Sequence, residues 1–225
     1  MPTRRSLLRA AGLAGAAGLA GCTAIAGDSG PLPDPGDGGT RPSDREHPPD
    51  ATHRATVTAS DPAPDLPVRP TVSLADPYVT SGSPPVLRVD VENPTDGPVT
   101  VGEYRSVVFQ YVESGDGRLV WLPHSERSTS GEPDRTTPDY ETGGEGCWQL
   151  DSHVAVTLEY GTVEIPAGGT LTAFVGLYAT PDANGCLPTG THRFEAAYNV
   201  FPDGVPAGDD NPSATWGFDL SLAEL

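Results

Sequence analysis

The side chains that could take part in catalysis or metal binding are five histidines, three cysteines, and many serines and carboxylates. Serine hydrolases and zinc peptidases place their reactive residues at recognisable spacings. No serine lies in a Gly-x-Ser-x-Gly turn, and no histidine lies in a His-Glu-x-x-His pair. We therefore expect His124, His153 and His192 to be surface or strand-end residues, and the protein not to be an enzyme.

Electron transfer through copper is a second chemistry that the histidines and cysteines could serve. A blue-copper site needs two histidines, a cysteine and usually a weak axial methionine close together. The only methionine is Met1, and Cys186 is followed by His192 at a longer spacing than such sites use. We expect no cofactor.

The N-terminal segment has the order of features found in an export signal. Arg4 and Arg5 precede a short stretch rich in glycine, alanine and leucine, which is the layout of a twin-arginine signal. That stretch is too short to span a bilayer, which takes roughly 20 apolar residues. We predict a signal peptide over residues 1–21.

The signal ends at Leu19-Ala20-Gly21-Cys22, which resembles the lipobox of lipoproteins. In a lipobox a diacylglyceryl group alkylates the cysteine thiol before cleavage, and two acyl chains form a stable anchor where one would be marginal. We predict lipid on Cys22 and a location on the extracellular face of the cell membrane. The alternative is a plain secretory signal with a chance cysteine.

Cys147 and Cys186 are the cysteines that remain after lipidation. In an oxidising compartment a pair of thiols usually closes into a disulfide. A bridge between them would close a loop of about 40 residues and stabilise the domain by roughly 3 to 4 kcal/mol on the chain-entropy model. We predict this disulfide, with a metal thiolate or a nucleophilic cysteine as the alternatives.

An acidic loop over residues 203–211 gathers oxygen atoms that could bind calcium. The ligands would be Asp203, Asp209, Asp210 and Asn211. The loop does not follow the twelve-residue alternation of an EF-hand, so a solvated acidic turn is the favoured interpretation. We expect no other metal site.

Composition limits the partners of the protein. The formal net charge is −18, and all 13 basic residues are arginine. Nucleic acid and an anionic bilayer surface would repel such a chain, so neither is an expected partner for the domain. Acidity with arginine in place of lysine is similar to the proteins of salt-loving archaea; the alternative is an acidic protein from a GC-rich bacterium.

The 225 residues leave room for one ordinary domain in addition to processing and linker segments. From Thr23 to about Pro67 the chain has hardly any large apolar residue, which predicts a disordered tether. His47 and His53 would be solvated residues within it. We therefore divide the chain into a signal peptide (1–21), a lipidated linker (22–67) and a folded domain (68–225).

The folded domain consists of short alternating runs of apolar and polar residues, separated by turns rich in the 27 glycines and 25 prolines. The expected strands are 72–74, 86–91, 107–112, 119–122, 154–158, 162–165, 171–178, 192–200 and 216–220. Ser114-Gly115-Asp116-Gly117 predicts a hairpin turn, and a polar insert covers 124–146. Seven to nine strands without an amphipathic helix predict an antiparallel immunoglobulin-like β-sandwich. A jelly roll or small barrel is the alternative.

Several turn motifs carry a family resemblance. They are Val89 to Val99 with its Asn-Pro-Thr-Asp-Gly-Pro centre, Val120-Trp121, Ile165-Pro166-Ala167-Gly168-Gly169, and Leu187 to Phe194. Together they resemble the BsuPI-like (intracellular proteinase inhibitor) domain and related immunoglobulin-like modules of haloarchaeal lipoproteins. The resemblance covers roughly Thr71 to Val200, and the polar insert has no counterpart in it. It implies an immunoglobulin-like fold and, as an activity, proteinase inhibition.

We expect a non-enzymatic, membrane-anchored surface lipoprotein that acts as a binding or envelope-structural module. Its partners would be the membrane, through the lipid, and a protein or envelope ligand that the sequence does not identify. An extracellular proteinase inhibitor and a Ca²⁺-dependent adhesion domain are the alternatives.

Overall fold

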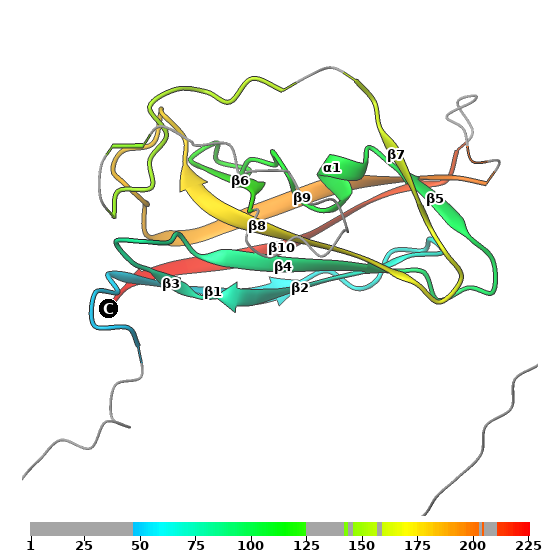
Figure 1. Ribbon diagram of the computed structural model, residues 1–225, viewed down its shortest axis with the longest axis horizontal. Coiled ribbons are helices and arrows are strands. Elements are labelled where there is room, and N and C mark those ends of the chain that lie inside the picture. Colours follow the sequence, from blue (N-terminus) through cyan, green and yellow to red (C-terminus); the bar gives the residue numbers. More distant parts are fainter. Residues whose placement is uncertain (1–46, 125–141, 144–145, 157–158, 203, 205–210) are drawn as a thin grey trace, which may run out of the picture. The chain divides into compact units, whose positions relative to one another are not determined.

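The computed structural model describes residues 47–124, 142–143, 146–156, 159–202, 204 and 211–225. They form an all-β, antiparallel, immunoglobulin-like sandwich of two sheets, as the sequence predicts (Figure 1). Ten strands and one short helix lie in these residues, against the seven to nine strands expected. Among them no helix is long and apolar enough to cross a membrane.

The larger sheet has six strands in the order β3-β1-β10-β9-β5-β7. Their bounds are β1 (His53–Ser60), β3 (Tyr78–Val79), β5 (Val99–Gly102), β7 (Thr162–Ile165), β9 (Gly190–Phe201) and β10 (Ser213–Glu224). The smaller sheet has four strands in the order β2-β4-β8-β6. These are β2 (Arg69–Asp76), β4 (Val86–Glu92), β6 (Leu119–Pro123) and β8 (Thr170–Ala179).

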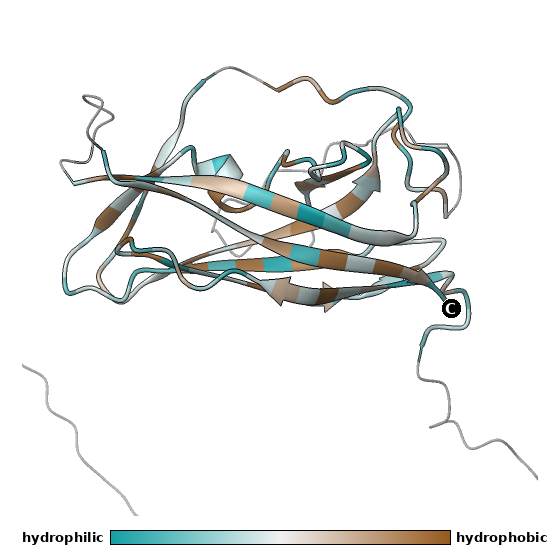
Figure 2. Ribbon diagram, turned by 180° about the vertical axis from the view of Figure 1, so that it is seen from behind, coloured by the Kyte–Doolittle hydropathy of each residue, from teal (hydrophilic) through white to brown (hydrophobic). Residues whose placement is uncertain are grey.

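The core lies between the sheets and is rich in aromatic rings. Apolar and polar residues alternate along β9 and β10, so one face of each strand is apolar (Figure 2). Phe194 of β9 stacks on Phe218 of β10 at 5.6 Å between ring centroids, and Trp121 of β6 lies 5.4 Å from Phe194. The three rings are buried, so they join the two sheets through one continuous aromatic contact.

The predicted turn at Asn93 is confirmed, and the structure shows what the asparagine does. Its side chain is buried, and Nδ2 donates hydrogen bonds to the carbonyls of Gly97 and Ile165 at 2.8 and 2.9 Å. Its Oδ1 accepts one from the Thr95 amide at 3.0 Å. Asn93 thus ties the turn after β4 to the end of β7, which joins two of the motifs that carry the family resemblance.

The ordered domain begins earlier than the sequence predicted. Strand β1 lies inside the segment 22–67 that was expected to be a disordered linker, and it pairs with β10 from His53↔Glu224 to Ser60↔Phe218. Its apolar side chains are few and short, and Ala55 is the one that is fully buried. Strand β1 is held by backbone pairing with β3 on one side and with β10 on the other, so low hydrophobicity was a misleading signal here.

The run 107–112 is not a strand, which corrects a second prediction. Helix α1 (Tyr104–Val107) covers its start, and Phe109 and Tyr111 have left-handed φ angles of 60° and 62°. Beyond this turn the chain lies along the outer edge of β6, where the Tyr111 amide donates to the Trp121 carbonyl at 2.7 Å. The side chains of residues 107–109 are buried, but the backbone turns where a strand would run straight.

The predicted hairpin turn at 114–117 is present. The Gly117 amide donates to the Ser114 carbonyl at 2.8 Å, Gly117 has a φ of 69°, and Glu113 forms a bridge with Val120 on the other side of the turn. The strand expected over 154–158 is absent from residues 154–156; residues 157–158 lie outside the described part of the chain.

Candidate functional site

Cys147 and Cys186 form a disulfide with Cα atoms 4.7 Å apart, which confirms the predicted pairing. The alternatives of a metal thiolate and a nucleophilic thiol do not apply to these residues. The bridge joins the described segment that starts at Gly146 to the loop between β8 and β9.

The bridge holds residues 148–150 against the end of β8. The Ala179 amide donates to the Trp148 carbonyl at 2.8 Å, and the Leu150 amide donates to the Ala179 carbonyl at 3.0 Å. The side-chain amide of Gln149 donates to the Ala183 carbonyl at 2.7 Å. This segment therefore extends the small sheet with a short parallel bridge, Gln149↔Ala179.

Trp148 lies beside the bridge and packs on the outer face of the small sheet. Its ring stands edge-on to Tyr178 at 5.9 Å between centroids, and its Nε1 donates to the Thr80 carbonyl at 3.0 Å. Burial raises the pKa of Tyr178 to about 12, so this ring is neutral in ordinary conditions.

A pocket of about 160 Å³ lies on this outer face, over β6. Its floor is formed by Val120, Leu122 and Leu150, which belong to a small hydrophobic cluster separate from the main core. Further lining comes from Tyr111, Glu113, His153, Val154, Val156 and Pro181. The pocket thus has an apolar floor, while its mouth also carries polar groups such as Glu113 and His153. An apolar surface with a few placed polar groups is the usual character of a ligand site.

Two segments form the walls of the pocket. One is the disulfide-bonded segment 147–156, and the other is the hairpin that carries Glu113 and Val120. The Thr180 hydroxyl donates to the Gly117 carbonyl at 2.8 Å and so fixes the tip of that hairpin to the end of β8. Exposed His153 lies 3.3 Å from the Asp182 carboxylate at the rim.

A buried histidine holds the same hairpin from the other side. Nδ1 of His192 lies 3.0 Å from Oδ2 of Asp116, and Nε2 lies 3.1 Å from the Pro188 carbonyl. A carbonyl and a carboxylate both accept hydrogen bonds, so each ring nitrogen of His192 lies against an acceptor. His192 was expected to be a surface or strand-end residue; it lies near the start of β9 but is 3% exposed.

The electrostatics of Asp116 fit this arrangement. Burial by itself would raise the pKa of Asp116, but hydrogen bonds from the Ser114 hydroxyl and the Arg118 amide, together with the charge of His192, lower it below its usual value. Ser114 Oγ lies 2.5 Å from Oδ1 of Asp116. The serine therefore bonds to the aspartate and Nε2 of the histidine bonds to a carbonyl, so these three residues do not have the order of a Ser-His-Asp triad.

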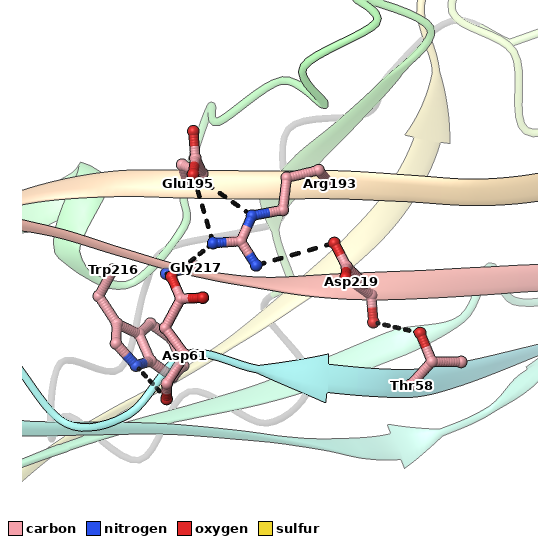
Figure 3. Close-up of polar contacts among 7 residues, drawn as sticks. All are labelled: Thr58, Asp61, Arg193, Glu195, Trp216, Gly217 and Asp219. Atoms are coloured by element: carbon pink, nitrogen blue, oxygen red, sulfur yellow. Dashed lines mark hydrogen bonds and ion pairs between the residues drawn. The ribbon is translucent and has the colours of Figure 1, made fainter.

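A second polar cluster lies on the outer face of the large sheet (Figure 3). Arg193 of β9 forms ion pairs with Asp61, Glu195 and Asp219. Asp61 also accepts from the Gly217 amide through Oδ2 at 2.9 Å and from Trp216 Nε1 through its carbonyl at 3.0 Å. These contacts therefore hold Asp61, the residue after β1, against β9 and β10.

The remaining predicted site residues are not tested by the structure. Arg4, Arg5, Cys22, Asp203, Asp209 and Asp210 lie outside the described residues, and of the calcium candidates only Asn211 lies within them. His47 is exposed, and His53 belongs to β1 and is not a linker residue. Within the described part of the chain, no group of three or more His, Cys, Asp or Glu side chains could hold a metal ion.

The chain was compared with protein-family models, with curated proteins and with solved structures, and none of them matches it.

Proposed function

We propose that this protein is a lipid-anchored surface lipoprotein whose β-sandwich is a non-enzymatic binding module. The lipid on Cys22 holds the chain at the extracellular face of the membrane, and the pocket over β6 is the binding site. The twin-arginine pair Arg4 and Arg5 and the lipobox at 19–22 support the location.

The observation that carries the proposal is the disulfide between Cys147 and Cys186. Disulfides persist in oxidising compartments and are rare in the reducing cytosol of most cells, so this bond supports export. The disulfide also holds the segment that forms one wall of the pocket. This wall therefore depends on a bond that forms in an oxidising compartment.

The pocket supports a binding role in preference to a purely structural one. A structural module needs only a closed core. This domain also has a second apolar cluster beside a pocket. The pocket is open to solvent at Val156, which is 49% exposed. Proteinase inhibition and Ca²⁺-dependent adhesion remain alternatives drawn from the sequence, and no contact among the described residues favours either. The strongly acidic surface disfavours nucleic acid.

Cell fractionation tests the proposal through the Cys22→Ser variant. The wild-type protein should sediment with membranes in high salt, and the variant should be found in the soluble fraction because it has no thiol to alkylate. A Cys147→Ser/Cys186→Ser variant is the matched control, since it keeps Cys22 and should stay with the membrane. A Cys22→Ser protein that still sediments with membranes would show that the anchor is not this lipid.

A further inference from the structure

The size of the pocket over β6 limits what it can hold. Sites for whole cofactors and drug-sized ligands are about 300 to 1,000 Å³. This pocket is about 160 Å³ and is therefore suited to a single apolar side chain. In protein interfaces such a pocket is where a buried anchor residue of the partner inserts.

The floor and the hairpin wall of the pocket are held in place by the fold. Leu122 is fully buried, and Leu150 and Val120 are nearly so, so the floor is packed before any partner arrives. The floor is tied to β8 by the Leu150 amide, and the hairpin wall is tied there by Thr180. A site that needs no reorganisation on binding loses less affinity to ordering.

The charged groups at the mouth of the pocket determine which partner residues can lie beside the inserted side chain. The Glu113 carboxyl group is exposed and lines the pocket. The other titratable residues that line the pocket are Tyr111 and His153, and His153 lies 3.3 Å from the Asp182 carboxylate. None of the described residues that line the pocket is an arginine, so the mouth is complementary to a basic group.

We propose that the pocket over β6 binds a protein segment in which one aliphatic side chain is flanked by basic residues. The aliphatic group fills the space over Val120, Leu122 and Leu150, and a basic neighbour lies against Glu113. This inference rests on the proposed binding function and names its partner class.

Fluorescence anisotropy with the full-length protein in detergent tests this directly. The probe is a labelled, acetylated and amidated peptide with one leucine between two arginines. One comparison peptide replaces the leucine with alanine, and a second replaces both arginines with glutamate. We expect saturable binding of the first peptide, and binding weaker by on the order of tenfold or more for each of the other two.

Two variants and two matched controls locate the binding. Glu113→Lys reverses the charge at the mouth, and Glu164→Lys makes the same change at an exposed position on β7. Val156→Ser removes an exposed apolar group at the pocket, and Leu225→Ser does the same at the exposed C-terminus. The pocket variants should weaken binding on the order of tenfold, and the controls should bind as the wild type does.

Each other outcome contradicts the proposal. Equal binding of the alanine peptide would mean that no apolar side chain is recognised, and equal binding of the glutamate peptide would remove the charge argument. Saturable binding that the pocket variants leave unchanged would place the site elsewhere, and absence of binding to the folded wild type would reject this ligand class. Membrane fractionation of the same samples keeps the anchor separate, because it depends on Cys22 and not on the pocket.

Discussion

Nδ1 of His192 lies 3.0 Å from Oδ2 of Asp116, across 76 residues of sequence. This contact joins β9 to the tip of the hairpin whose Glu113 and Val120 line the pocket. The histidine side chain is 2% exposed, whereas that of the aspartate is 42% exposed. The pair therefore fixes the hairpin from inside while the carboxylate remains partly hydrated.

Asp116→Asn should destabilise the fold by about 1 kcal/mol at neutral pH, because it weakens a charge-assisted hydrogen bond whose partly exposed carboxylate is screened by solvent. Urea unfolding measures the change in the free energy of unfolding. Asp96→Asn is the matched control, since Asp96 is exposed in another turn. If both variants lower the free energy of unfolding equally, the contact with His192 does not contribute to stability as proposed.

The same carboxylate predicts how stability changes with acid. The pKa of Asp116 is lower in the folded protein than its ordinary value of 3.8, so its contribution is present above that pH and is lost as the pH falls through the folded value. The difference in unfolding free energy between wild type and Asp116→Asn should therefore shrink as the pH is lowered through the range below 3.8. A difference that stays constant over this range would contradict the lowered pKa.

Reduction of the Cys147–Cys186 bridge should lower the free energy of unfolding by about 4 kcal/mol, because the bond closes a loop of 39 residues in the unfolded chain. Denaturant unfolding with and without reductant gives the difference. The double serine variant should be as unstable as the reduced protein and should not respond to reductant. Two reactive thiols in unfolded, unreduced protein would show that the bond does not form.

Asp61→Ala should cost about 1 to 2 kcal/mol, because Oδ2 accepts from both the Gly217 amide and the Arg193 guanidinium. Glu195→Ala is the control: Glu195 contacts the same guanidinium at 3.3 Å but its side chain is 55% exposed, so its removal should cost less than about 0.5 kcal/mol. Thermal unfolding compares the two. A Glu195 effect as large as that of Asp61 would mean that the number of ion pairs to Arg193, and not the position of Asp61, holds this segment.

Replacing Arg4 and Arg5 with lysine should block export, because the twin-arginine route recognises the guanidinium pair and not charge alone. The precursor, with its signal peptide uncleaved, should accumulate inside the cell, and immunoblotting of cell fractions detects it. A double variant that reaches the membrane in normal amounts would assign export to another route.

The sequence predicted the sandwich because polar and apolar residues alternate along β4, β9 and β10, and because β8 is a short apolar run. It missed β1, whose small Ala55 gives no hydrophobic signal although the backbone is paired on both sides. It also predicted a strand through Phe109, because burial of consecutive apolar residues looks the same in a strand and in a turn with left-handed φ angles.

The disulfide followed from cysteine count and compartment, but the pocket could not be predicted. Tyr111, Leu122, Leu150 and Pro181 come from four segments that only the pairing of β6, β8 and the bridged segment brings together. Likewise, Asp61 and Arg193 are 132 residues apart, so no local pattern indicates that they meet.

The mass of the N-terminal peptide of the mature protein, isolated from membranes and measured by mass spectrometry, tests the central claim most directly. We predict that the chain begins at Cys22 and that its sulfur carries a diacylglyceryl group. A mature chain that begins at any other residue, or one whose Cys22 thiol is unmodified, would contradict the lipoprotein assignment.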